Sequence, residues 1–257
     1  MPASVRSKKI LFVLFLAVVF AWSFNQLKES DSFYHLKTGE LIWQTKAIPH
    51  ADVFSFTALG ARWVPHEWLA ELTMYGVWNI GGFWLLIAAV AALACATYYF
   101  LFKTALLRGA SPGMAIGVLL AVGALTFELW IPRPQIFSYF SLALLIYALS
   151  RLEAGASRMY AALAAGAVLL WANTNASVLL GLVVVAWWAA TMLVGRRISP
   201  KLIAGVVWGS LAAACLNPVG PSVLWYAADI RAGASAFTVL EWKSILAFLG
   251  QWEPRVF

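Results

Sequence analysis

The chain has 257 residues, of which 63% are hydrophobic and 11% are charged, and its mean hydropathy is +0.81. These values exclude an ordinary soluble domain, in which about 25% of the residues are charged. The net charge of +7 comes without an arginine-rich helix, a zinc-finger spacing or a basic surface with interleaved aromatic residues, so we expect no nucleic-acid partner. The composition predicts an all-α integral membrane protein that crosses the lipid bilayer several times.

The first apolar segment, residues 10–24, follows the basic residues Arg6, Lys8 and Lys9. This order is typical of a secretory signal peptide or of a first membrane helix. No small-residue cleavage site follows the segment, so we expect an uncleaved helix with its N-terminus in the cytoplasm. In either case the chain that follows is expected on the outer side of the membrane.

The outer loop between the first two apolar segments, residues 25–81, concentrates the ionisable groups of the chain. It contains all three histidines and six of the eleven acidic residues. Titratable groups crowded beside a membrane crossing indicate a functional site at that membrane face. These residues are His35, His50, His66, Glu29, Asp31, Glu40, Asp52, Glu67 and Glu71.

The outer loop predicts two interfacial helices that lie along the membrane surface. Ser30-Asp31-Ser32 is a helix N-cap signal, and apolar residues recur at helical spacing after it, so the first helix is expected to begin at this signal and to extend to about Thr45. The second is expected to begin near His66-Glu67 and to carry aromatic residues towards the second membrane helix. Gly81-Gly82 is interpreted as the hinge between this second interfacial helix and the second membrane helix.

A small β-hairpin is predicted between the two interfacial helices. Residues 53–57 and 62–64 are rich in side chains that favour strands. Leu59-Gly60 supplies the turn that would join them.

Six further apolar segments give a total of about seven predicted transmembrane helices. Crossing about 30 Å of hydrocarbon takes about 20 residues of helix. The uncharged stretch 159–195 is too long for one crossing and is expected to be a helical hairpin that turns at Asn173-Thr174-Asn175. The other predicted membrane helices cover residues 83–102, 113–130, 135–150 and 202–216.

These helices and the outer loop form one predicted membrane module, residues 1–220. Asn217-Pro218-Val219-Gly220-Pro221 is expected to end its last helix. Residues 221–257 are interpreted as an interfacial C-terminal segment. They form either the natural end of the chain or the start of a further region.

The distribution of basic residues supports this layout, because cytoplasmic loops of membrane proteins hold an excess of Lys and Arg. With the N-terminus inside, ten of the 18 basic residues fall in inner segments, which contain only one acidic residue, Glu153. The pattern predicts a multi-pass protein of the cytoplasmic (inner) membrane with its outer loop facing outward. The ten residues are Arg6, Lys8, Lys9, Lys103, Arg108, Arg151, Arg158, Arg196, Arg197 and Lys201.

Four residues of the outer loop are candidates for chemistry. Asp31 and His35 lie four positions apart and share a helix face, while His66 and Glu67 open the second helix. One interpretation is structural: a helix cap, a surface histidine and a helix start. The other is a site for a divalent metal, Mg²⁺ or Mn²⁺, with these four residues as ligands. No fixed spacing such as His-Glu-x-x-His decides between them.

The run Asp31-Ser32-Phe33-Tyr34-His35-Leu36-Lys37 after the first membrane helix resembles the Asp-containing segment of GT-C-type integral membrane glycosyltransferases. That superfamily includes oligosaccharyltransferases and protein mannosyltransferases. A group of bacterial polytopic proteins usually assigned to it is similar over nearly the whole chain. The matching motifs are residues 39–44, 48–49, 54–57, 66–69, 133–135, 171–173, 217–218 and 241–242.

The resemblance implies an inverting transfer of a hexosyl or pentosyl group from a polyprenyl-phosphate-linked sugar to a glycan, lipid or protein acceptor on the outer face. The acidic residue that serves the superfamily as catalytic base or metal ligand would be Asp31, assisted by His35 or Glu67. A carboxylate suits the role of base because the acceptor hydroxyl must lose its proton. Related chains continue into further spans, so this chain is expected either to be a fragment or to need a membrane partner subunit.

The phosphate of such a donor needs a cationic partner, and Arg133 is expected at the outer end of the third and fourth helices. The alternative is that Arg133 extends to the interface or pairs with Glu128. Gln135 and Asn173 are expected at the same depth, with His66 as a further substrate contact. Such polar groups either bind sugar hydroxyls or fasten helices together.

A non-catalytic membrane protein is the alternative to an enzyme. It would be a degenerate module, or a transport or assembly subunit. Against a transporter, no charged residue lies near the middle of a predicted span and no inverted repeat is visible.

Overall fold

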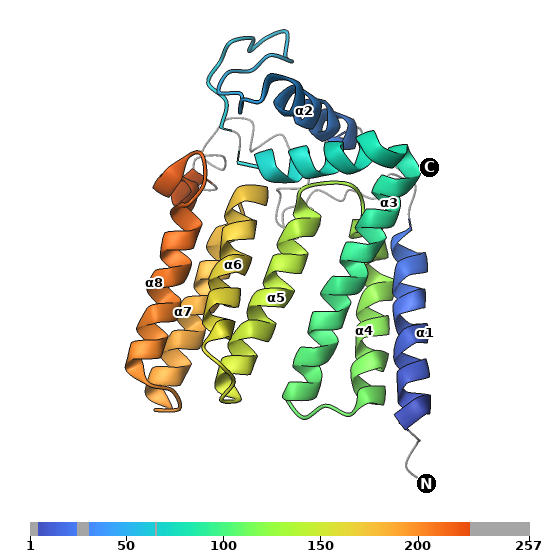
Figure 1. The fold of residues 1–257 in the computed structure, drawn as a ribbon, viewed down its shortest axis with the longest axis vertical. Coiled ribbons are helices and arrows are strands. Elements are labelled where there is room, and N and C mark those ends of the chain that lie inside the picture. The colour runs from blue at the N-terminus through green and yellow to red at the C-terminus, as the bar shows by residue number, and fades with distance from the viewer. Residues whose placement is uncertain (1–4, 25–30, 65, 227–257) are drawn as a thin grey trace, which may run out of the picture.

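The computed structural model describes residues 5–24, 31–64 and 66–226. Every regular element in this part of the chain is a helix, and most of the helices lie side by side in one bundle (Figure 1). The prediction of an all-α fold is confirmed for these residues. The elements are α1 (Val5–Ser23), α2 (Asp31–Thr45), α3 (Trp68–Leu107), α4 (Pro112–Thr126), η1 (Phe127–Leu129), α5 (Gln135–Glu153), α6 (Met159–Thr174), α7 (Val178–Val194), α8 (Pro200–Cys215) and η2 (Gly220–Ser222).

Each of the seven segments predicted as membrane helices overlaps a helix or part of one, and residues 113–130 overlap α4 together with η1. Three stretches are long and apolar enough to cross a membrane alone, namely Trp68–Leu107, Pro112–Leu129 and Gln135–Glu153. A fourth is added if α8 and Gly220–Tyr226, which are bent by 101° relative to each other, count as one span. The other apolar helices, Ile10–Ser23, α6 and α7, are 10–17 residues long, so seven crossings stay a prediction.

A sharp break divides α3 into two parts that run in different directions. Gly81 and Gly82 have non-helical backbone angles, and the φ of Gly82 is +61°, in the left-handed region that glycine enters without steric cost. Residues 68–80 lie across one end of the bundle, whereas residues 83–107 run along it (Figure 1). The predicted hinge is confirmed, and the predicted second interfacial helix is the part of α3 before it.

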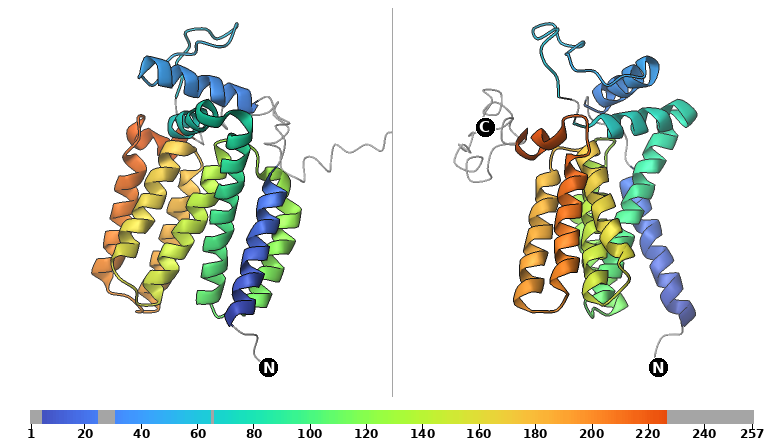
Figure 2. Two further views of the ribbon diagram at one scale, coloured as in Figure 1. Left: turned by 45° about the vertical axis from the view of Figure 1, so that its right-hand side comes forward. Right: turned by 60° about the vertical axis from the view of Figure 1, so that its left-hand side comes forward.

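α2 lies across the same end of the bundle and packs against α3 (Figures 1 and 2). Its bounds are those predicted for the first interfacial helix. The contact is closest at Gly39, where an added Cβ would lie 2.1 Å from the carbonyl oxygen of Glu71. Glycine is therefore required for this approach, and the buried side chains of Leu36 and Met74 pack beside it.

Two apolar cores hold the bundle together. One joins α5, α6, α7 and α8 around the buried Leu145 and Trp171. Trp171 fits because Gly181 faces it, where an added Cβ would lie 3.0 Å from the indole ring. The other core joins α1, α3, α4 and the start of α5 around Phe15 and Val90. Since α3 also packs against α5, the two cores form one continuous bundle (Figure 2).

The predicted hairpin between residues 53–57 and 62–64 is wrong. The pairing lies earlier in the chain, where Ala51 forms an isolated bridge with Arg62, and residues 31–64 contain no strand. The carboxylate of Asp52 accepts hydrogen bonds from the backbone amides of Phe54 at 2.8 Å and Ser55 at 3.0 Å. These bonds turn the chain and remove those amides from a β-ladder.

The end of α8 at Cys215 agrees with the predicted stop signal. The side-chain amide of Asn217 donates to the carbonyl oxygens of Ala214 at 2.8 Å and Gly220 at 3.1 Å, which closes the chain into a turn. Most of the C-terminal segment predicted for residues 221–257 lies outside the described residues, which end at Tyr226.

Candidate functional site

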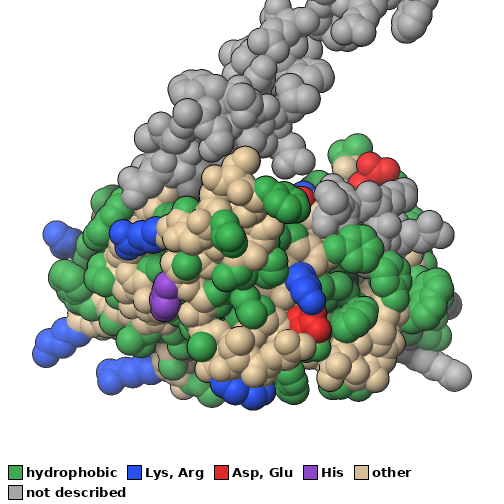
Figure 3. All heavy atoms as spheres, turned by 90° about the horizontal axis from the view of Figure 1, so that it is seen from above, with side chains coloured by type: hydrophobic (Ala, Val, Ile, Leu, Met, Phe, Trp, Pro, Cys, Tyr) green, Lys and Arg blue, Asp and Glu red, His purple; other side chains and the backbone are tan. Residues whose placement is uncertain are grey.

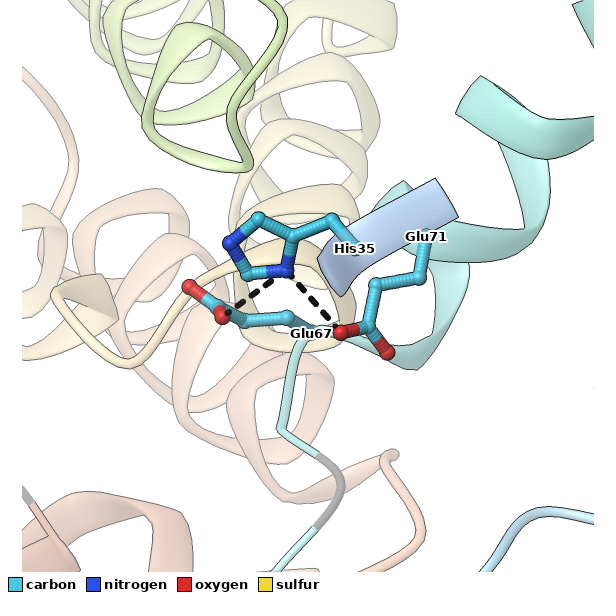
Figure 4. A group of neighbouring side chains, drawn as sticks. All are labelled: His35, Glu67 and Glu71. Atoms are coloured by element: carbon cyan, nitrogen blue, oxygen red, sulfur yellow. Dashed lines mark hydrogen bonds and ion pairs between the residues drawn. The ribbon is translucent and has the colours of Figure 1, made fainter. Parts of the chain in front are cut away.

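Three ionisable side chains meet where α2 crosses the start of α3. His35 belongs to α2, Glu71 to the first turn of α3, and Glu67 directly precedes α3. Nδ1 of His35 lies 3.0 Å from Oε1 of Glu71 and 3.9 Å from Oε2 of Glu67, and Figure 4 shows the three side chains turned towards one another. Only 7% of His35 and 3% of Glu71 are exposed. We call these three residues the His35 cluster.

Helical spacing explains why these residues meet. His35 and Gly39 lie four positions apart and therefore on the same face of α2. Glu67 and Glu71 are also four apart, and the amide nitrogen of Glu71 donates to the carbonyl oxygen of Glu67 at 3.0 Å. Because Gly39 brings the two backbones into contact at Glu71, His35 lies one helical turn away, beside both carboxylates.

Burial shifts the ionisation of the cluster towards neutral forms. Removal from water raises the pKa of Glu71 to about 8. Burial also raises the pKa of Glu67, although His66 and His35 oppose that shift. The pKa of His35 is lowered by burial, against the effects of Glu67 and Asp31. At neutral pH the cluster therefore keeps a proton on Glu71 beside an uncharged imidazole.

The turn between α6 and α7 provides a further contact to the cluster. Nδ2 of Asn175 donates to Oε1 of Glu67 at 2.9 Å. The orientation of this amide is set by its oxygen, which accepts hydrogen bonds from the backbone amide of Ser177 at 3.0 Å and from its hydroxyl at 2.6 Å. His66 also approaches Glu67, with 3.7 Å between Nε2 and Oε1. Glu67 is thus held in place by groups from two parts of the chain.

An ion pair lies beside the cluster. Nη2 of Arg133, in the segment between η1 and α5, donates to Oδ2 of Asp31 in the first turn of α2 at 2.7 Å. Arg133 thus contacts the carboxylate of Asp31, whereas the sequence suggested Glu128 as an alternative contact. Asp31 lies one helical turn before His35 on α2, so the ion pair lies close to the His35 cluster. Asp31 raises the pKa of His35 and Arg133 lowers it.

Asn173, a predicted sugar ligand, fastens three elements together. Its Oδ1 accepts a hydrogen bond from Nε1 of Trp68 at 3.0 Å. Its Nδ2 donates to the carbonyl oxygens of Leu169 at 2.9 Å and Leu216 at 2.8 Å. These bonds link the start of α3, α6 and the end of α8, which favours the helix-fastening interpretation of this residue.

The other two predicted substrate ligands lie near the same end of the bundle. Gln135 begins α5, two positions after Arg133, and its buried Oε1 accepts no hydrogen bond from the described part of the chain. Nδ1 of His66 lies 3.0 Å from the carbonyl oxygen of Val64, and its ring lies 4.7 Å from that of Tyr226. The structure therefore places both residues near the ion pair or the cluster.

The structure changes the set of ligands expected for a metal. The ligand atoms of His35, Glu67 and Glu71 lie within 4.8 Å of one another. Asp31, which was expected as a ligand, is held by Arg133 instead, and His66 is not in this group. Glu71 had no predicted role, although its spacing of four from Glu67 places both carboxylates on one helix face.

Aromatic rings surround the cluster on the side of the outer loop. The ring of Tyr34 lies 5.3 Å from the imidazole of His35, and Phe54 and Trp63 pack on Tyr34 at 5.8 and 6.1 Å. Phe56 of the same loop is fully exposed. Figure 3 shows hydrophobic side chains spread over this face with scattered charged ones between them. Such a face suits contact with a membrane interface.

Comparisons with known proteins do not assign the chain to a family. No family model, curated protein or solved structure matches it. The resemblance to GT-C-type glycosyltransferases therefore stays a proposal that depends on short motifs. We infer the function from the geometry of the site.

Proposed function

We propose that the chain is a membrane glycosyltransferase that moves a sugar from a polyprenyl-phosphate donor to an acceptor at the membrane face that carries α2. The observation that carries this proposal is the contact between Asp31 and Arg133 beside the His35 cluster. It joins an exposed carboxylate to a cation suited to phosphate. Both lie at the end of a bundle of apolar helices, where a lipid-linked donor would present its phosphate.

The transfer needs a base and a phosphate ligand in one place. As the acceptor oxygen attacks the anomeric carbon, its O–H bond breaks, and the bond from that carbon to the phosphate oxygen breaks with its electrons leaving on polyprenyl phosphate. Asp31 takes the proton, because its side chain is 53% exposed and open to an acceptor. Arg133 binds the phosphate through its planar guanidinium.

The buried residues assist by positioning this pair. His35 lies one helical turn after Asp31, and its contact with Glu71 limits the rotation of α2 about its axis. That rotation determines where Asp31 meets Arg133. Glu67 supports the same arrangement through its contacts with His35 and with Asn175.

The same proposal places the chain in the cytoplasmic membrane, with seven crossings, a cytoplasmic N-terminus and α2 outside. Basic residues at the end of the bundle opposite α2 support this orientation. Arg108 at the end of α3 pairs with Glu153 at the end of α5 at 3.1 Å, and Arg158 and Lys201 lie at the starts of α6 and α8. The lipid of the donor would then stay in the bilayer while its phosphate reaches the outer face.

Mass spectrometry of lipid-linked sugars and envelope glycans tests the proposal. It compares cells that lack the gene, cells that carry it and cells that carry Asp31→Asn. We expect one polyprenyl-phosphate sugar to accumulate and one glycan modification to disappear in the deletion and in the Asp31→Asn cells. Glu40→Gln is the matched control, because Glu40 is an acidic residue of the same helix that pairs with the exposed Lys37. It should leave both profiles unchanged.

Arg133→Lys sharpens the test, because lysine keeps the charge but loses the forked geometry. Loss of charge-assisted hydrogen bonds to the phosphate should slow transfer about 10- to 100-fold. Unchanged profiles in Asp31→Asn cells that make normal amounts of the protein would contradict the proposal and favour the non-catalytic alternative.

A further inference from the structure

We propose that His35, Glu67 and Glu71 form a binding site for one divalent transition-metal ion, with Zn²⁺ as the best fit. The site lies within the region assigned to glycosyl transfer, so a catalytic use of the ion rests on the proposed function. Binding of the ion does not rest on the proposed function, since it follows from these three side chains alone.

The three donor atoms converge as metal ligands do. Nδ1 of His35 faces both carboxylates, at 3.0 and 3.9 Å, and all three ligand atoms lie within 4.8 Å of one another. Ligands placed about 2.1 Å from a tetrahedral Zn²⁺ are about 3.4 Å apart. The distances of 3.0 and 3.9 Å from Nδ1 of His35 lie on either side of that spacing.

The two buried carboxylates of the cluster also favour a cation, which would take the place of a proton. Two carboxylates lie within hydrogen-bond or ion-pair distance of one imidazole, in surroundings where His35 and Glu71 are almost fully buried. Buried carboxylates are costly unless a proton or a cation compensates them. A divalent ion at the centre of the cluster would neutralise both glutamates.

Groups behind the ligands hold them in place, as is usual around metal ions. Asn175 donates to Glu67, and Ser177 fixes the orientation of the Asn175 amide. His35 is held from the other side by the ring of Tyr34. The ligands are therefore preorganised by residues from α2 and from the turn between α6 and α7.

The types of donor atom select the metal. An imidazole ligand favours Zn²⁺ or another transition metal over Mg²⁺ and Ca²⁺, which prefer sites made of oxygen alone. Three protein ligands are typical of Zn²⁺ sites that bind a water or substrate oxygen in a fourth position. This site differs from the Mg²⁺ or Mn²⁺ site around Asp31 that the sequence suggested.

Zn²⁺ binding to the full chain, purified in lipid nanodiscs and freed of metal with EDTA, tests the proposal. Calorimetry and elemental analysis should give one Zn²⁺ per chain. Glu71→Gln and Glu67→Gln keep the size of the side chain and should each weaken Zn²⁺ binding by more than about 100-fold. Asn175→Ala removes a supporting group and should weaken Zn²⁺ binding less, by about 10- to 100-fold. Glu40→Gln should bind as the wild type does.

Co²⁺ provides a second measurement that needs no variant. Bound in place of Zn²⁺, it should give the intense visible absorption of a four-coordinate ion, whereas a weak spectrum like that of hydrated Co²⁺ would overturn the proposal. So would wild-type protein that takes up no Zn²⁺, or folded Glu71→Gln and Glu67→Gln variants that bind it with unchanged affinity. These measurements involve no sugar transfer, so a failure of the proposed function leaves their result intact.

Discussion

The surroundings of Glu71 change its ionisation near neutral pH. Its carboxyl titrates at about 8 instead of near 4.5, because it is buried. Between these two values the folded protein keeps a proton that the unfolded chain has released. The stability that this group contributes is therefore fully present below pH 4.5 and is lost as the pH rises through 8.

We expect metal-free protein to become less stable between about pH 5 and 8, by up to about 1.4 kcal/mol per pH unit from Glu71. Glu67, with its raised pKa, acts in the same direction, whereas His35, with its lowered pKa, acts in the opposite direction below pH 6.5. Glu71→Gln imitates the protonated carboxyl and should flatten the dependence. Thermal unfolding in EDTA over this pH range measures the dependence of stability on pH for both proteins. Parallel profiles for the two proteins would show that Glu71 does not retain its proton.

At the scale of single residues, the sequence predicted the members of the site better than their contacts. Asp31, His35 and Glu67 could be chosen because they are ionisable groups in a short polar loop of an apolar chain. The contact of Asp31 with Arg133 joins positions 102 residues apart, and that of Asn175 with Glu67 joins positions 108 apart. No local pattern links such positions, so these contacts became visible only in the fold.

The packing of α2 on α3 decides whether the site forms, and it depends on Gly39. In Gly39→Ala the new Cβ would lie 2.1 Å from the carbonyl oxygen of Glu71 and 2.7 Å from Cβ of Tyr75. α2 must then move away, which should destabilise the protein by about 1–3 kcal/mol and separate His35 from Glu71. The unfolding temperature and the Zn²⁺ affinity should both fall.

Gly76→Ala is the matched control for this prediction. Gly76 lies in α3 near the same contact, but an added Cβ there meets no atom within 4 Å. Alanine is the better helix former, so this change should stabilise the protein by about 0.5–1 kcal/mol. If the two glycine variants behaved alike, the close contact at Gly39 would not limit the packing.

At the scale of elements, signals that act over a few residues correctly predicted where α2 begins and where α3 bends. The start of α2 at Asp31 and the Gly81-Gly82 hinge depend on backbone geometry that neighbouring residues determine. The hairpin failed for a related reason, because the carboxylate of Asp52 binds the amides that a ladder would have used. Strand-forming composition alone does not reveal that competition.

The arrangement of the whole molecule predicts that the two ends of the helix bundle lie on opposite sides of the membrane. Phe56, in the loop beyond α2, is fully exposed, and Arg196, after α7, is exposed at the opposite end. In a background with Cys95 and Cys215 replaced by alanine, a membrane-impermeant maleimide should label Phe56→Cys in intact cells. It should label Arg196→Cys only after the membrane is permeabilised. Labelling of both positions in intact cells would contradict the seven-crossing layout.

At this scale, composition and hydropathy predicted the class of the protein and the order of its helices, because polar turns separate the apolar segments. They did not predict which helices touch. The fit of Trp171 against Gly181, for example, depends on the mutual approach of α6 and α7, and nothing in either segment alone reveals it. Packing of this kind emerges from the whole bundle.

The hydrogen bond between Asn175 and Glu67 has a consequence for the order in which the contacts of the His35 cluster form during synthesis. A membrane protein is inserted from its N-terminus as the ribosome makes it. His35, Glu67 and Glu71 are present early, but their supporting amide arrives 108 positions after Glu67. In a nascent chain that has not yet extended beyond α6, Glu67 therefore lacks this hydrogen bond. The contacts of the His35 cluster are complete only once the turn between α6 and α7 has been made and has packed beside Glu67.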